Sequence, residues 1–181
     1  LRCRQEINDQ KMVAGLIYLD NYDEALESVE EVRRSLLTAL IDRKINKYIS
    51  GMNGITKKLE KDKYFFAIKQ RYVQELRDNR FSLLEEVKTV NIGNEMAVTL
   101  SIGLGMGGET YGQNYEFSRM AIDMALGRGG DQAAVKTVDG FEFYGGISHG
   151  VEKRSHVRSR IIANALCDLI KRSDSVIIMG H

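Results

Sequence analysis

The 181-residue sequence contains no proline and only two cysteines, Cys3 and Cys167. The absence of proline excludes Pro-rich linkers and fits a compact chain of helices and strands. The cysteines lie far apart without a CxxC or metal-ligand spacing, so we expect free thiols in a reducing compartment, which indicates the cytoplasm. No run approaches the ~20 apolar residues that a bilayer-spanning helix needs, and no signal peptide is visible.

Neither sign of charge dominates the composition. Lys and Arg total 26 and Asp and Glu total 25, and this balance gives no general attraction to nucleic acid or to an anionic membrane. Apolar residues make up 43% and charged residues 28%, which is typical of a soluble globular protein. A domain of this size buries roughly 68–70% of its unfolded surface, so it needs no disulfide or metal to fold.

Hydrophobic periodicity predicts one α+β domain over residues 12–145. The predicted strands are residues 12–19, the hairpin 51–59 and 64–69, residues 97–103, and a terminal hairpin 132–138 and 141–144; the predicted helices are residues 28–49, residues 72–90 with a break near Asn79, and residues 115–126. The first six elements predict a ferredoxin-like βαββαβ antiparallel sheet with two helices on one face. Because helices flank the first hairpin in sequence, we expect that hairpin in the middle of the sheet.

The two ends of the sequence are expected to lie outside this domain. Residues 1–11 are a polar lead-in, and the Gly-containing stretch 146–156 is a linker. Residues 157–181 form an amphipathic helix and an apolar strand that have no sheet partner within the sequence. We therefore expect them to open a second, α/β domain of a longer protein.

Polar residues follow the first strand and occupy the tip of the first hairpin. Asp20, Asn21 and Asp23 suit either a Mg²⁺ or nucleotide site or the start of a helix. The tip Glu60-Lys61-Asp62-Lys63 could contact phosphates through its lysines, or it could be a solvated turn. Both interpretations remain open for each stretch.

Three further stretches suggest ligands. Residues 125–132 contain three glycines and Arg128 and could wrap a phosphate, but they follow a helix, where Gly127 fits a C-cap. Tyr64-Phe65-Phe66 resembles an RNA-stacking strand, although adjacent aromatics cannot share one face, and we expect no nucleic acid. His181 follows an apolar strand, where an α/β fold could use it as a metal ligand.

The stretch Val98-Thr99-Leu100-Ser101-Ile102-Gly103 and the later residues 121–126 resemble the "VTvSIG … ADxAL" pattern of GGDEF domains, which have the diguanylate cyclase fold. The hairpin tip then falls on the Gly-Gly-Asp-Glu-Phe signature. Residues 20–24, 125–132 and 143–154 resemble more closely the cyclic-di-AMP phosphodiesterases of the GdpP/YybT type, in which a degenerate GGDEF domain precedes a DHH-type phosphodiesterase. Residues 176–181 resemble the start of that DHH domain, whose first metal ligand would be His181.

Departures from the cyclase pattern remove its chemistry. Glu60 and Lys61 replace the two glycines, Lys63 replaces the metal-binding Glu, and Tyr18 replaces the first metal-binding Asp. A cation and a phenol cannot supply the oxygen ligands that Mg²⁺ needs. We therefore predict no cyclic-di-GMP synthesis and no required cofactor for this domain.

The resemblance implies a larger protein with a different activity. That protein would be anchored in the membrane, face the cytoplasm, and hydrolyse cyclic-di-AMP to pApA at a Mn²⁺-dependent DHH site. The domain over residues 12–145 would regulate it, between an upstream sensor and the downstream DHH domain. Two alternatives are a nucleotide-binding module with weak Mg²⁺-ATPase activity through Asp20, Asn21, Asp62 and Lys63, and a spacer that forms homodimers and transmits signals.

Overall fold

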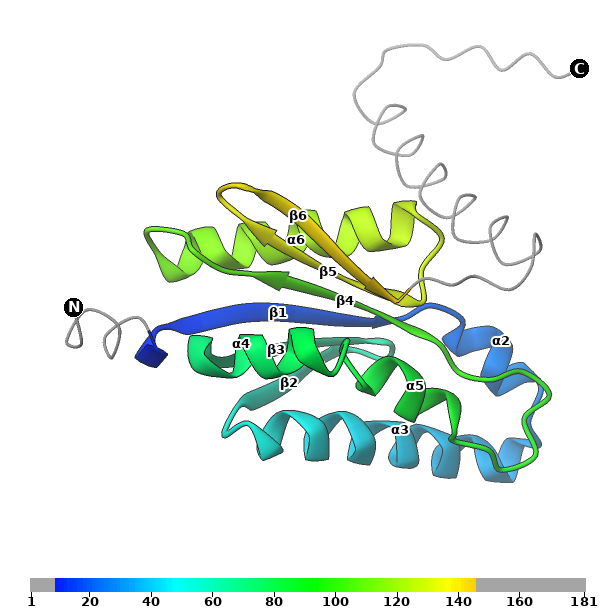
Figure 1. Ribbon diagram of the computed structural model, residues 1–181. Helices are drawn as coiled ribbons and strands as arrows, with labels where there is room; N and C mark the ends of the chain where they lie inside the picture. Colours follow the sequence, from blue (N-terminus) through cyan, green and yellow to red (C-terminus); the bar gives the residue numbers. More distant parts are fainter. Residues whose placement is uncertain (1–8, 146–181) are drawn as a thin grey trace, which may run out of the picture.

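The computed structural model describes residues 9–145, which form a sheet with helices on both faces (Figure 1). The predicted linker, the C-terminal αβ unit with His181 and most of the lead-in lie outside these residues. The elements in chain order are β1 (Met12–Leu19), α2 (Tyr22–Glu27), α3 (Glu31–Gly51), β2 (Ile55–Glu60), β3 (Lys63–Lys69), the 3₁₀ turn η1 (Gln70–Tyr72), α4 (Val73–Asp78), α5 (Leu83–Lys88), β4 (Leu100–Gly105), α6 (Tyr111–Gly127), β5 (Gln132–Thr137) and β6 (Gly140–Gly145). Within residues 9–145, no helix has both the length and the apolar character required to span a bilayer.

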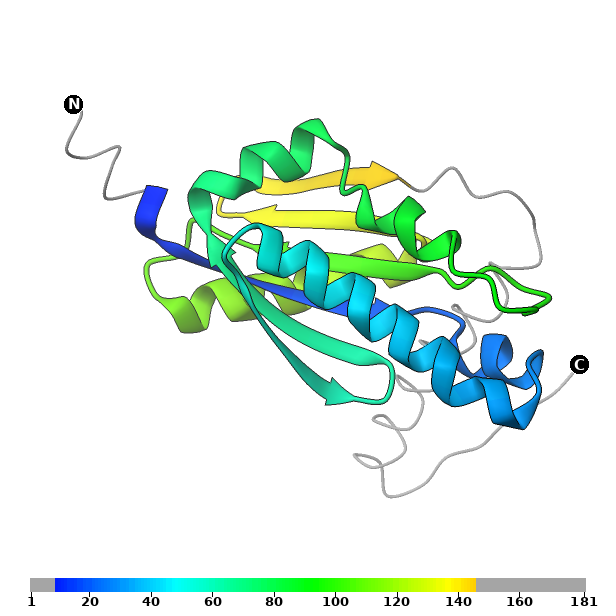
Figure 2. The same ribbon diagram turned by 90° about the horizontal axis from the view of Figure 1, so that it is seen from below.

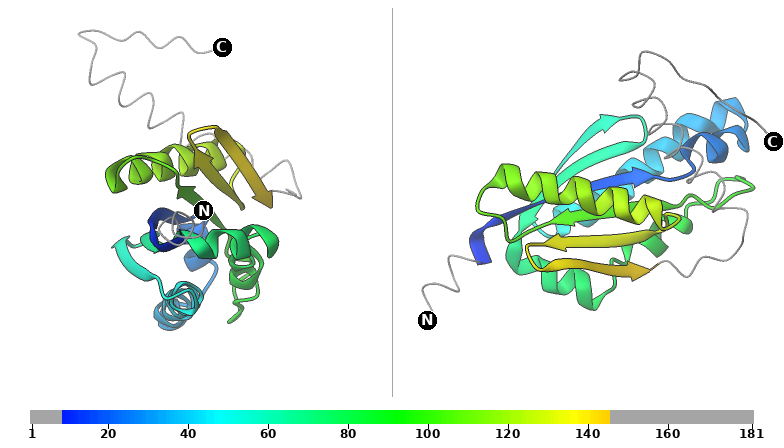
Figure 3. Two further views of the ribbon diagram at one scale, coloured as in Figure 1. Left: turned by 60° about the vertical axis from the view of Figure 1, so that its left-hand side comes forward. Right: turned by 90° about the horizontal axis from the view of Figure 1, so that it is seen from above.

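The sheet order is β2-β3-β1-β4-β5-β6. The first four of these strands pair antiparallel, and α3, α4 and α5 cover one face of the sheet (Figures 1 and 2). This arrangement confirms the predicted ferredoxin-like core. Beyond that core, β5 pairs parallel to β4, because α6 carries the chain back across the opposite face (Figure 3). The complete sheet is therefore mixed.

The centre of the sheet is β1 and not the β2–β3 hairpin. β1 is apolar and almost entirely buried, whereas β2 is an edge strand on which Ile55 and Leu59 are 64% and 47% exposed. The prediction of a central hairpin was therefore wrong. It relied on the order of elements in sequence, but the chain returns from β3 to place β4 on the far side of β1.

Helix α3 buries a stripe of residues spaced four apart against the sheet: Leu37, Ile41, Ile45 and Ile49. One such residue in each turn keeps the stripe on a single helix face. The helix predicted over residues 28–49 is α3, which begins three residues later, at Glu31, and is preceded by the separate short helix α2 that ends at Glu27. The hydrophobic pattern of the sequence also predicted Val32 in this stripe, but Val32 does not follow the four-residue spacing within α3 and is 90% exposed.

The predicted break near Asn79 is present between α4 and α5. Arg80 and Phe81 adopt left-handed backbone conformations there, with φ of 53° and 56°. A non-glycine residue rarely takes this conformation unless packing holds it, and Phe81 is 1% exposed in the core. Burial of this ring therefore fixes the turn that ends α4.

Helix α6 lies against β4 at close range because β4 carries glycines where the helix crosses it. A Cβ at Gly103 would lie 2.4 Å from the Ile122 nitrogen, and one at Gly105 would lie 1.9 Å from the Asn114 oxygen. Small buried residues continue the contact: Ala121, Ala125 and Ala134. Helix α6 begins at Tyr111, four residues before the predicted start, because the Thr110 hydroxyl caps it by accepting from the Gln113 N–H at 3.1 Å.

Candidate functional site

The four residues predicted to bind a nucleotide lie at one end of the sheet. Because β1 and β3 are antiparallel, the end of β1 meets the start of β3, and the Leu19 N–H donates to the Asp62 carbonyl at 2.9 Å. Asp20 and Asn21 directly follow β1, and Lys63 begins β3. The sequence therefore identified residues that are neighbours in space.

Tyr18 and Lys63 are directly opposed cross-strand partners. The Lys63 ammonium lies 5.4 Å from the centre of the Tyr18 ring and 2.8 Å from a carboxylate oxygen of Glu60. Burial raises the pKa of the Tyr18 hydroxyl above its ordinary value, and the Lys63 charge offsets part of that rise. The pair is therefore a neutral phenol beside a cation at neutral pH.

These are the two positions at which the resemblance to cyclases places carboxylate ligands. A cation repels Mg²⁺, and a protonated phenol is a poor ligand for it. Within residues 9–145 no group of three or more His, Cys, Asp or Glu residues is arranged to hold a metal ion. The side chains at this end of the sheet do not fit the cyclase metal.

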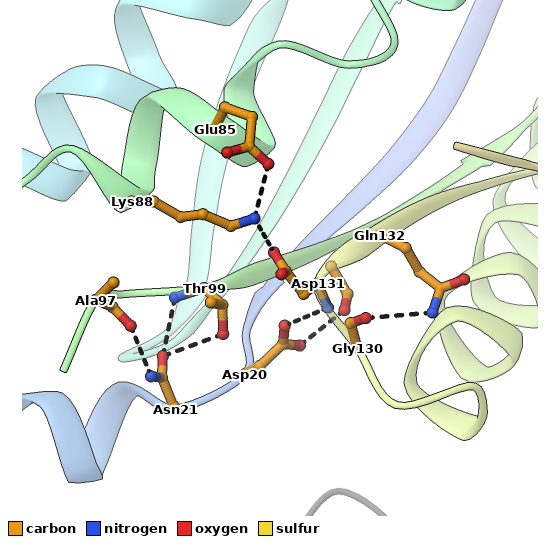
Figure 4. Close-up of polar contacts among 10 residues, drawn as sticks. Asp20, Asn21, Glu85, Lys88, Ala97, Thr99, Gly130, Asp131 and Gln132 are labelled. Atoms are coloured by element: carbon orange, nitrogen blue, oxygen red, sulfur yellow. Dashed lines mark hydrogen bonds and ion pairs between the residues drawn. The ribbon is translucent and has the colours of Figure 1, made fainter. Parts of the chain in front are cut away.

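Asp20 holds the Gly-rich loop that follows α6 (Figure 4). One carboxylate oxygen accepts from the Ser101 hydroxyl at 2.7 Å, and the other accepts from the Asp131 N–H at 2.8 Å. The loop fits tightly because Gly130 has a φ of +73°, and a Cβ there would lie 2.9 Å from the Asp20 carboxylate carbon. The loop thus binds an anion through the Asp131 N–H, but this anion is a side chain of the same chain.

Residues 125–132 do cap the end of α6, but the prediction that Gly127 is the cap residue was wrong. Helix α6 includes Gly127. Positive φ occurs at Asp131 and at the two glycines that precede it, Gly129 and Gly130. Their N–H groups return to the last carbonyls of the helix, from Gly129 to Leu126 and from Gly130 to Ala125, both at 3.0 Å. Glycine at these positions avoids the steric cost of positive φ.

Asn21 joins the turn after β1 to the segment before β4 (Figure 4). Its amide nitrogen donates to the Ala97 carbonyl at 2.9 Å, and its amide oxygen accepts from the Thr99 N–H at 2.9 Å. The strand predicted from residue 97 starts at Leu100. The Asn21 amide takes up backbone groups that would otherwise join the ladder.

The hairpin tip is only partly solvated. Lys61 is exposed and pairs with Asp23 at 2.6 Å, as expected for a charged turn. Asp62, in contrast, is 4% exposed, so the interpretation of a wholly solvated tip was wrong for that residue. The Asp62 carbonyl binds the end of β1 and thereby draws the residue inward.

Lys88 extends this polar network to α5 and was not identified from the sequence. Its ammonium lies 2.9 Å from Asp131 and 2.7 Å from Glu85 (Figure 4). Burial lowers the pKa of Lys88, but the hydrogen bonds to Glu85 and Asp131 outweigh burial and raise it above its ordinary value. The sequence carries no signal for this contact, since Lys88 is one of many helix-surface lysines.

The fold matches solved cyclase domains. The active GGEEF domain of a diguanylate cyclase from Vibrio cholerae superposes with a TM-score of 0.58 at 12% identity, covering 74% of this chain and 88% of that one. A diguanylate cyclase/phosphodiesterase from Caldicellulosiruptor saccharolyticus gives a TM-score of 0.59 at 14% identity, covering 78% of this chain and 85% of that one. At such identities the likeness establishes the fold alone.

Sequence comparison identifies closer relatives. The chain is 36% identical over its whole length to the cyclic-di-AMP phosphodiesterase GdpP of Geobacillus thermodenitrificans (strain NG80-2) and covers 27% of that protein. It is 34% identical to the cyclic-di-AMP phosphodiesterase PdeA of Listeria monocytogenes serotype 1/2a (strain 10403S), with 94% of this chain and 26% of that protein covered. The chain thus spans about a quarter of the length of these relatives. Residues 17–143 match the family model described as the GGDEF domain of cyclic-di-AMP phosphodiesterase GdpP-like proteins, and the chain belongs to this family.

Proposed function

We propose that residues 12–145 are a catalytically inactive, regulatory GGDEF-like domain within a cyclic-di-AMP phosphodiesterase. The opposed Tyr18–Lys63 pair carries this proposal, because it places a phenol and a cation where a cyclase needs carboxylates. The tip adds a second obstacle. Glu60 and Lys61 have side chains where the signature's glycines let backbone approach a phosphate closely.

The whole protein, on this proposal, hydrolyses cyclic-di-AMP to pApA at a Mn²⁺-dependent DHH site downstream. The relatives are named as cyclic-di-AMP phosphodiesterases, which supports the substrate. His181, outside the described residues, would be the first ligand of that metal site. The protein would be membrane-anchored and face the cytoplasm, with the present domain linking an upstream sensor to the DHH domain.

The ATPase alternative receives less support from the contacts. Both carboxylate oxygens of Asp20 accept hydrogen bonds from Ser101 and Asp131, and the Asn21 amide is engaged at both ends. A nucleotide at these residues would have to displace bonds that hold loops together. The homodimeric spacer remains a prediction, to be tested by sedimentation of the isolated chain.

Two assays test the proposal. The purified chain, incubated with GTP and Mg²⁺ or Mn²⁺ beside an active cyclase, should form no cyclic-di-GMP; product formation at the rate of the active cyclase would refute the loss of chemistry. In the full-length protein, deletion of residues 12–145 should change the rate of cyclic-di-AMP hydrolysis, whereas His181→Ala should abolish the Mn²⁺-dependent hydrolysis. An unchanged kcat/KM after the deletion would refute a regulatory role.

A further inference from the structure

The groove between α3 and α5 contains a pocket that the predicted site residues do not line. It has a volume of about 600 Å³, within the range of roughly 300–1,000 Å³ that is typical of small-molecule sites. Helices α3 and α5 cover the face of the sheet opposite α6 (Figures 1 and 2). Tyr18, whose electrostatic neighbours include Asp123 and Tyr115 of α6, lies on the other face.

Three cationic side chains from neighbouring turns of α3 line this pocket: Arg43, Lys44 and Lys47. None of them forms an ion pair with another residue of the described range 9–145. The acidic residue of the lining is Glu86, which accepts a hydrogen bond from Ser82 at 3.0 Å. Cations outnumber acids here, although the chain as a whole carries a net charge of only +1.

The floor of the pocket is apolar and aromatic. Val90 is buried at 5% exposure, and Leu40 and the Tyr48 ring are partly buried beside it. Burial raises the pKa of the Tyr48 hydroxyl, so the ring stays an uncharged phenol at neutral pH and does not repel an anion. Leu40 and Tyr48 pack against the core cluster that includes Val90, and the parts of these side chains that remain accessible offer an apolar surface that suits the flat ring of a ligand.

We propose that this pocket binds a phosphorylated small molecule with a planar ring, which is the chemistry of a nucleotide. The α3 cations bind its phosphates, and the ring packs on Tyr48, Leu40 and Val90. Charged hydrogen bonds and apolar contact together give both affinity and orientation in small-molecule sites. The site is independent of the proposed regulatory function, since it can be measured on this chain alone.

Calorimetric titration of the 181-residue chain with ADP, pyrophosphate and adenosine tests the pocket. ADP should bind most tightly, because it alone satisfies both the cations and the floor. Lys44→Ala/Lys47→Ala should weaken ADP binding by about tenfold or more, which corresponds to about 1.4 kcal/mol. Lys11→Ala/Lys57→Ala removes the same charge from exposed positions elsewhere and should leave ADP affinity unchanged. Thermal melts check that both variants fold.

Amide chemical-shift mapping locates the ligand. Changes at residues 40–48 and 86–91 would support the pocket, whereas changes centred on Asp20, Asn21 and Lys63 would overturn it in favour of the other end of the sheet. Absence of ADP binding at millimolar concentration would overturn it as well. Equal weakening by the two double variants would show general charge attraction and would also refute the site. None of these outcomes depends on the cyclase or phosphodiesterase assays.

Discussion

Replacement of Asp20 by Ala tests whether this residue is a structural anchor. The carboxylate accepts one bond from Ser101 and one from the Asp131 N–H, both shorter than 3 Å. Hydrogen bonds to charged groups contribute about 1.5–3 kcal/mol each, and a pair at one side chain is not fully additive. We therefore expect Asp20→Ala to lower the free energy of unfolding by about 2–4 kcal/mol.

Urea unfolding followed by circular dichroism measures this loss. Asp23→Ala is the matched control, because Asp23 lies three residues later, in the first turn of α2, and its ion pair with Lys61 is exposed. This variant should leave the free energy of unfolding close to that of the wild type. Ser101→Ala should cost about 1–2 kcal/mol, and less when Asp20 is already Ala, since one bond is shared. The structural role of Asp20 would be refuted if the free energy of unfolding of Asp20→Ala equalled that of the wild type within error. It would also be refuted if the losses from Asp20→Ala and Ser101→Ala were fully additive in the double variant.

Three further predictions concern packing and titration. Gly105→Ala should destabilise the chain by about 1–3 kcal/mol through overpacking against α6. Gly112→Ala, where a Cβ would make an ordinary contact with the Thr110 hydroxyl oxygen at 3.8 Å, should stabilise the chain by about 0.5–1 kcal/mol. Thermal melts compare the two variants, and equal effects would contradict the close contact between β4 and α6. Burial and the hydrogen bond to Asp42 raise the pKa of Tyr64, so Tyr64 contributes stability below its ordinary pKa of about 10 that is lost as pH rises further. Spectrophotometric titration should therefore show its phenolate only on unfolding. Lys88 also has a raised pKa, so its charged form stabilises the fold below its ordinary pKa of about 10.4, and this stability is lost at higher pH. Lys88→Met removes the titrating group. The urea midpoint of this variant should therefore fall less between pH 7 and the alkaline range than that of the wild type.

The sequence predicted most of the elements because their hydrophobic periods are strong. The buried run of β1 and the four-residue spacing of the α3 stripe need no tertiary information. The position of the hairpin at the sheet edge could not be predicted in the same way. Strand order is set by which side of β1 receives β4, and local periodicity does not encode that choice.

The candidate site shows the same division. Residue types and the end of β1 pointed correctly to Asp20 and Asn21 as neighbours of the tip. Their roles depend on partners that are distant in sequence. Asp20 binds Ser101 and Asp131, which are 81 and 111 residues away along the chain, and Asn21 binds Thr99, which is 78 residues away. A carboxylate that binds a metal and one that binds a loop look alike in sequence, because the difference lies in the donors that folding brings to them.

The chain enters the sheet at Met12 and leaves it at Gly145. Met12 pairs with Lys69 at one end of the sheet, whereas Gly145 pairs with Gln132 at the other end, and Figure 1 shows the two ends apart. Tension between them runs along the strands over about 25 Å, given a rise of about 3.3 Å per residue. The ladder hydrogen bonds lie across that direction and are loaded together in shear. The sheet should therefore be stiff against tension applied between Met12 and Gly145.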